Sequence, residues 1–77
     1  MNYKLYSSEG CHLCEQAYIL CQQANIDQQV IVVDIIDDEK LVELYGISIP
    51  VFEHINTGEK LFWPFTLEQL KEAIREF

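Results

Sequence analysis

The residues of this sequence best suited to chemistry are two cysteines, Cys11 and Cys14, with two residues between them. They follow Gly10 and precede a helical pattern, within the stretch SSEGCHLCEQA. Such a pair can cycle between dithiol and disulfide, supply half of a metal site, or pack as two small apolar side chains. A disulfide between them would close a loop too short to stabilise the fold as a structural disulfide does. In a reducing compartment, the spacing therefore favours a catalytic or metal-binding pair.

Cys11 falls at the expected start of the first helix, where unpaired backbone N–H groups and the helix dipole favour an anion. Because such a position stabilises a thiolate, we expect Cys11 to be the nucleophile. Cys14 lies one turn further along, from where it can attack a mixed disulfide on Cys11 and release the product. His12 either stabilises the thiolate as a protonated imidazole or faces solvent as a first-turn residue.

A metal site is the main alternative, and it requires four ligands. The obvious set is Cys11, His12, Cys14 and Cys21. These residues crowd on one helix, and His12 and Cys14 point in different directions, so we expect no metal site within a single chain. A cluster shared between two chains, or a binding module without turnover, stays open. Cys21 lies on the same stripe as Cys14 and is expected to be a small buried hydrophobe.

The elements that position these residues are expected in the order β-α-β-α-β-β-α, within one domain over 1–77. Strands are predicted over 2–6, 29–36, from Pro50 to 55, and over 60–63. Helices are predicted over 11–24, from the acidic stretch 37–39 to Tyr45, and over 67–76. A helix joins the first two strands, which should be parallel, and the Asn56-Thr57-Gly58 turn makes the last two a hairpin. Gly46 should end the second helix, and Thr66 with Gln69 forms a capping box for the third.

The charge balance restricts the possible partners. The formal net charge is -8, from 13 acidic and 5 basic residues, which argues against nucleic acid and against an anionic membrane surface. A basic patch on a protein partner is compatible with this charge. No stretch approaches the roughly 20 apolar residues that cross a bilayer. The N-terminal MNYKLYSS lacks the apolar segment of a secretory signal. We therefore expect a soluble, cytoplasmic protein.

Together, these features resemble the glutaredoxin-like branch of the thioredoxin fold. The likeness rests on CHLC after the first strand, Ile49-Pro50-Val51 before the third, the hairpin and the short last helix, and it covers the whole chain. CHLC, YGISIPV and FWPF are similar in particular to short bacterial glutaredoxin-like proteins. The resemblance implies an α/β thioredoxin-like fold with a four-stranded mixed sheet and helices on both faces.

The resemblance also implies a thiol-disulfide oxidoreductase that acts as a monomer on protein disulfides and needs no bound cofactor. Its electrons would come from glutathione or from a reductase. The Ile49–Pro50 bond would be cis and face the cysteines, with Ile49 presenting backbone groups to an extended substrate. The rest of the substrate-binding surface would comprise His12, Leu13, Trp63 and Thr66. Trp63, with Phe65, could instead pack between the hairpin and the last helix.

Departures from the glutaredoxin pattern bear on glutathione. Ser8 stands where glutaredoxins usually carry a lysine for a glutathione carboxylate, and CHLC replaces the usual CPYC. A Gly-Gly-x-Asp turn usually precedes the last helix, and the matching stretch here, 63–66, contains Pro64, which lacks an amide donor. The amides of Thr66 and Leu67 could still bind a carboxylate. We therefore expect protein disulfides to be the substrates and leave glutathione open as a co-substrate.

Overall fold

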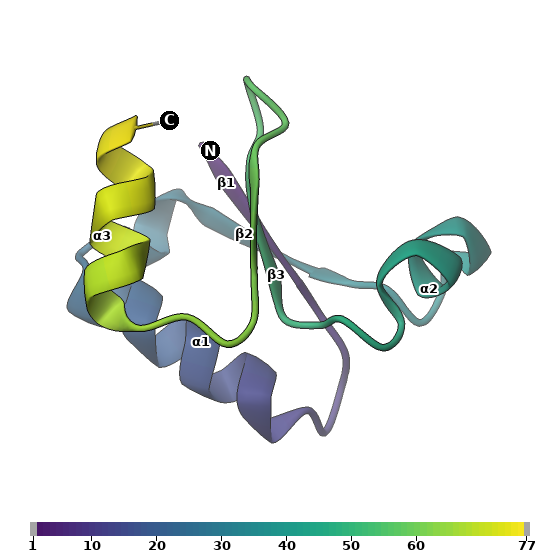
Figure 1. Cartoon of the computed structure of the whole chain (residues 1–77). Coiled ribbons are helices and arrows are strands. Elements are labelled where there is room, and N and C mark those ends of the chain that lie inside the picture. The colour runs from purple at the N-terminus through teal and green to yellow at the C-terminus, as the bar shows by residue number, and fades with distance from the viewer. Residues whose placement is uncertain (1, 77) are drawn as a thin grey trace.

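Four strands form one sheet in the order β2-β1-β3-β4, and helices cover both of its faces in the computed structural model, which describes residues 2–76 (Figure 1). The expected element order is confirmed, with one short 3-10 helix added. In chain order the elements are β1 (Tyr3–Ser7), α1 (His12–Gln23), the 3-10 helix η1 (Asp27–Gln29), β2 (Val30–Asp34), α2 (Glu39–Tyr45), β3 (Val51–His54), β4 (Lys60–Phe62) and α3 (Leu67–Glu76).

The pairing of the two central strands determines where the site lies. β1 pairs in parallel with β2 and antiparallel with β3, and β3 forms the expected hairpin with β4. Tyr6, near the end of β1, lies opposite Val51 at the start of β3. The loop that follows β1 and the loop that precedes β3 therefore leave the sheet at the same end. This places the Cys11 loop and the Pro50 loop at one end of the molecule.

Two hydrophobic clusters lie on opposite faces of the sheet, because successive side chains of a strand point to opposite sides. Leu5 of β1 belongs to the larger cluster, and its neighbour Tyr6 belongs to the smaller one. α1 and α3 cover the larger cluster, whereas α2 covers the smaller one (Figure 1). The larger cluster comprises Tyr3, Leu5, Ala17, Cys21, Ile26, Val30, Phe52, Phe65 and Leu70. The smaller one comprises Tyr6, Ile35, Tyr45 and Val51.

Side-chain caps set the starts of the second and third helices. The Asp38 carboxylate accepts the backbone N–H groups of Lys40 and Leu41, at 3.0 and 3.3 Å, and begins α2. The predicted capping box of α3 is present: Thr66 Oγ1 accepts the Gln69 N–H at 3.1 Å, and Gln69 Oε1 accepts the Thr66 N–H at 2.8 Å. Within the described residues, none of these helices is long and apolar enough to span a membrane.

Two departures from the sequence prediction have a local structural cause. β2 ends at Asp34, not at Ile36, because the Asp34 carboxylate accepts the Ile36 N–H at 3.0 Å and turns the chain. Gly46 ends α2 as expected, but its φ of -52° is right-handed rather than left-handed. A steric restriction, not a left-handed backbone, accounts for glycine at this position, because a Cβ there would lie 2.5 Å from the Val42 carbonyl oxygen.

Candidate active site

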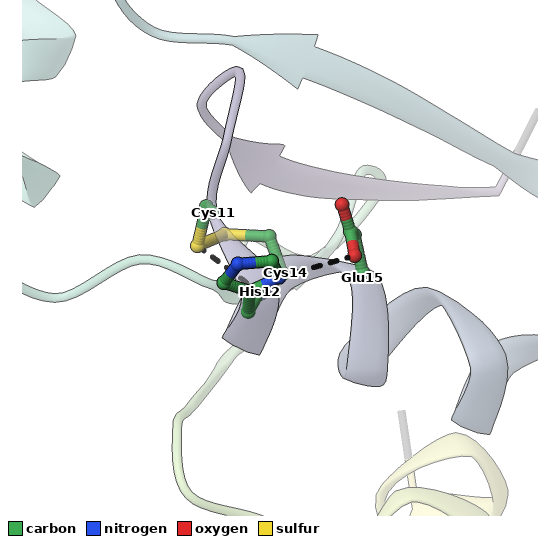
Figure 2. Close-up of a disulfide and its surroundings, with 4 residues drawn as sticks. All are labelled: Cys11, His12, Cys14 and Glu15. Carbon is green, nitrogen blue, oxygen red and sulfur yellow. Dashed lines mark hydrogen bonds and ion pairs between the residues drawn. A yellow bond between two sulfur atoms is a disulfide. The ribbon is translucent and has the colours of Figure 1, made fainter.

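Cys11 is the N-cap of α1, and its sulfur acts as the capping acceptor. Its backbone is extended, with φ -84° and ψ 103°, and its Sγ accepts the Cys14 N–H at 3.1 Å (Figure 2). Oxygen side chains usually fill this position. The sulfur of Cys11 therefore lies at the positive end of α1, against an N–H group that would otherwise have no partner in the helix.

Cys11 and Cys14 are joined by a disulfide, with 5.2 Å between their Cα atoms (Figure 2). This is the usual Cα separation of a bridged pair. The two residues differ in access: Cys11 is half-buried, whereas only 3% of Cys14 is exposed. An incoming thiol or disulfide therefore reaches the Cys11 sulfur more readily, which is the difference that the predicted roles of nucleophile and resolving cysteine require.

The loop before β3 brings Ile49 and Pro50 to the same end of the sheet. The Ile49–Pro50 peptide bond is cis, as the resemblance implies, and Pro50 is fully buried. The Ile49 N–H donates to the Tyr45 carbonyl at 3.0 Å. A substrate backbone could therefore pair with the carbonyl group of Ile49 but not with its N–H. The Trp63–Pro64 bond is also cis, which sequence reasoning missed, since only about 5–6% of bonds before proline are cis.

The two residues between the cysteines are both exposed. The His12 ring is 88% exposed, and its Nδ1 lies 3.6 Å from Glu15 Oε2 (Figure 2). Leu13 is 46% exposed beside it. The structure thus places His12 as a first-turn residue in solvent, with a carboxylate as its neighbour. Sequence reasoning missed Glu15, although its position three residues after His12 on a helix was the available signal.

Trp63 and Thr66 line a groove between α1 and the start of α3, with a volume of about 460 Å³. The Trp63 ring packs edge-on against Phe65, with 5.0 Å between ring centroids. Phe65 is a core residue with 4% exposure, so the packing alternative describes it well. Trp63 is half-buried, packs against the larger cluster and also faces this groove.

A second groove, of about 440 Å³, opens directly beside the disulfide. Cys11 and Cys14 contribute to its wall, together with residues of β1, α1 and β2. Sequence reasoning missed this groove because strands far apart in the chain assemble it. We call it the α1–β2 groove, and its further lining includes Glu9, Glu15, Tyr18, Ile19 and Val32.

Cys21 is fully buried and not bonded to another cysteine. Burial, and secondarily the negative charge of Asp27, raises the pKa of the Cys21 thiol to about 12. A thiol in this state is a poor nucleophile. Among the side chains that the structure describes, no three His, Cys, Asp or Glu residues come together as a metal-binding group.

Comparisons with known proteins agree with this fold. Residues 3–75 match the sequence profile of the family described as Glutaredoxin-like domain (DUF836). The chain is similar to the X-ray structure of Northeast Structural Genomics target protein XcR50 from X. campestris, with a TM-score of 0.90 and 33% identity over 97% of each chain. The solution structure of the same target gives a TM-score of 0.89 and 34% identity, and the match covers 100% of this chain and 96% of that one. Among curated proteins, none matches significantly.

Proposed function

Since this chain belongs to the glutaredoxin-like domain family, we propose that it is a thiol-disulfide oxidoreductase that reduces disulfides in other proteins. One observation carries this proposal. The Cys11 sulfur is half-buried at the start of α1, accepts the Cys14 N–H at 3.1 Å, and is bonded to the buried Cys14 sulfur. A nucleophile and a resolving group need this combination of access, stabilisation and proximity.

The reaction begins from the reduced pair. The Cys11 thiolate attacks one sulfur of the substrate disulfide and forms a mixed disulfide with it. The substrate S–S bond breaks, and the other substrate sulfur leaves as a thiolate that takes up a proton. The Cys14 thiol then loses its proton and attacks the Cys11 sulfur of the mixed disulfide. The Cys11–Cys14 bond forms, and the substrate sulfur that was bonded to Cys11 leaves and is protonated. Two electrons pass from the cysteine pair to the substrate, so a thiol or dithiol donor must return them.

The exposure of the two cysteines supports this order of events. A substrate disulfide can reach Cys11, which is half-buried, but not Cys14, of which 3% is exposed. The mixed disulfide therefore forms on Cys11. Cys14 stays screened from substrate and within bonding range of its neighbour, which favours resolution over a second attack from outside.

We further propose that the domain acts as a monomer in the cytoplasm, without a bound cofactor, and that glutathione or a reductase supplies the electrons. Ser8 lies in the wall of the α1–β2 groove and its carbonyl accepts the Cys11 N–H at 3.2 Å, but it carries no charge for a glutathione carboxylate. Pro64 has no N–H to offer a ligand beside α3. Both features favour protein disulfides over glutathione as the substrate.

Turnover of a model protein disulfide tests the proposal. With dithiothreitol as donor, the wild type should accelerate reduction and Cys11→Ser should not. Cys21→Ala is the matched control, because it also removes one thiol but from the buried position. It should retain turnover. Unchanged turnover in Cys11→Ser would contradict the proposal. Stoichiometric metal in the purified protein, with thiols inert toward disulfides, would favour a binding module instead.

A further inference from the structure

The α1–β2 groove has an apolar wall that leads away from the cysteine pair. Leu5 of β1, Tyr18 and Ile19 of α1, and Val32 of β2 form much of it. Ile19 is 49% exposed and Val32 is 51% exposed, so large aliphatic side chains meet water beside the disulfide. Exposed apolar surface that forms a concave patch is typical of a place where another molecule binds.

The charges on this groove have one sign. Glu9 and Glu15 both line it, and no lysine or arginine is among its lining residues within the described chain. Asp34 adds a further carboxylate at this end of β2, where it lies opposite Ser7 of the groove wall. The cationic neighbour that the structure gives to Glu15 is His12, which is charged only when protonated.

The position of the groove relative to Cys11 determines what can enter it. Cys11 is part of the groove wall. A substrate cysteine bonded to the Cys11 sulfur therefore holds its own neighbouring residues next to the groove. Those residues would meet an apolar wall and the exposed carboxylates of Glu9 and Glu15, so an aliphatic side chain and a cationic side chain complement the surface. An anionic peptide such as glutathione does not complement it.

We propose that the α1–β2 groove binds the substrate segment that flanks the reactive cysteine, and that it selects protein disulfides flanked by apolar and basic residues. This inference rests on the proposed function and specifies its substrate class. Glu9 and Glu15 supply the preference for positive charge, and Val32 with Ile19 receives the aliphatic side chain.

The charge preference can be measured with two disulfide peptides of equal length, one with arginines and one with glutamates beside the cysteine. At low salt the wild type should reduce the arginine peptide with a kcat/KM about tenfold higher. Glu9→Gln combined with Glu15→Gln should reduce this ratio to about twofold or less, and high salt should do the same. Equal rates for the two peptides in the wild type would contradict the proposal.

A matched double variant separates the groove from the overall charge. Glu59→Gln combined with Glu72→Gln changes the net charge equally. Glu59 lies just before β4, in the hairpin connection that follows His54. His54 pairs with Tyr3, at the end of β1 that is opposite to the cysteine loop. Glu72 lies within α3, outside the groove wall. This variant should keep the full preference for the arginine peptide. An equal loss of this preference in both double variants would overturn the assignment of charge selection to the groove.

The apolar wall has its own control within β2. Val32 faces the groove, whereas Ile31, the preceding residue of the strand, points to the other face of the sheet and is 39% exposed. Val32→Thr should lower the preference for a leucine over a glycine beside the substrate cysteine about threefold. Ile31→Thr should leave this preference unchanged. Equal effects of the two variants would contradict the role of Val32.

A binding measurement keeps this inference separate from the proposed function. The same peptides with serine in place of cysteine can be titrated into the oxidised protein and followed by amide chemical shifts. The arginine peptide should shift the resonances of Ile19 and Val32, and the glutamate peptide should not. With wild-type turnover absent, these shifts would still support the groove while the redox proposal failed. Normal turnover with no shifts at these residues would overturn the groove and leave the redox proposal intact.

Discussion

The backbone N–H of Cys14 donates a hydrogen bond to the Cys11 sulfur at 3.1 Å, while the Cys14 side chain is bonded to that same sulfur. In the proposed reaction, Cys14 would therefore have two roles: its amide would stabilise negative charge on Cys11 in the reduced pair, and its thiol would attack Cys11 in the mixed disulfide. The spacing of three residues at a helix start makes both possible, because the N-cap side chain reaches the amide one turn ahead.

The first prediction concerns the reactivity of Cys11 in the reduced protein. Because its sulfur lies at the start of α1 and accepts an amide hydrogen bond, the thiolate should form at a lower pH than that of a free cysteine. Iodoacetamide should therefore alkylate Cys11 faster at neutral pH than it alkylates a cysteine in an unstructured peptide. Mass spectrometry of the digested protein locates the label. A rate equal to that of the free peptide would contradict this account.

A second prediction concerns the accessibility of Cys21. Its side chain is fully buried, and burial raises its thiol pKa to about 12. The oxidised, folded protein should therefore show no thiol that reacts with a chromogenic disulfide reagent at neutral pH. One thiol should appear on unfolding, and all 3 cysteines should appear after reduction and unfolding. A reactive thiol in the folded, oxidised protein would show that Cys21 is accessible.

The same pKa shift predicts a pH dependence of stability. The folded state raises the pKa of Cys21 from its ordinary 9.0 to about 12, so it favours the neutral thiol. Its contribution to the free energy of unfolding is complete below about pH 9 and is lost as the pH rises toward about 12. The difference in this free energy between wild type and Cys21→Ala should be constant below that window and should decline within it. A difference that stays flat throughout would contradict the shift.

The capping box of α3 gives a prediction on stability. Thr66→Ala removes the Oγ1 acceptor of the Gln69 N–H and should lower the free energy of unfolding by about 1 kcal/mol. Thr66→Ser keeps a hydroxyl at the same place and should lose much less. Urea denaturation of the three proteins measures both effects. Equal stability of the alanine and serine variants would mean that the hydrogen bond contributes nothing.

Local sequence signals predicted much of the fold. The three-and-four spacing of apolar residues indicated α1, and Thr66 with Gln69 indicated the start of α3. Periodicity alone did not place the end of β2. That end depends on the Asp34 side chain, which accepts an amide two residues ahead. The 3-10 helix at 27–29 has a single turn, too short for any periodic pattern to reveal.

Only part of the site could be predicted in the same way. Cys11 at a helix start follows from local sequence, and the cis bond before Pro50 follows from the family resemblance. The cis bond before Pro64 and the α1–β2 groove had no comparable local signal. The groove arises because β2 lies beside β1 at the sheet edge, where Val32 pairs with Leu5 and lines the same groove as the cysteine loop. Such an arrangement depends on tertiary packing, so the local sequence around Cys11 does not predict it.

The most direct test of the central claim is the site of the mixed disulfide. Reduced Cys14→Ser protein, mixed with an excess of a disulfide-bonded peptide, cannot resolve the intermediate. Mass spectrometry of the digested product should find the peptide attached to Cys11, and Cys11→Ser protein treated in the same way should carry no adduct. Two results would contradict the assignment of Cys11 as the nucleophile. One is an adduct on Cys14 in the Cys11→Ser protein that forms as fast as the adduct on Cys11 in the Cys14→Ser protein. The other is the absence of an adduct in both variants.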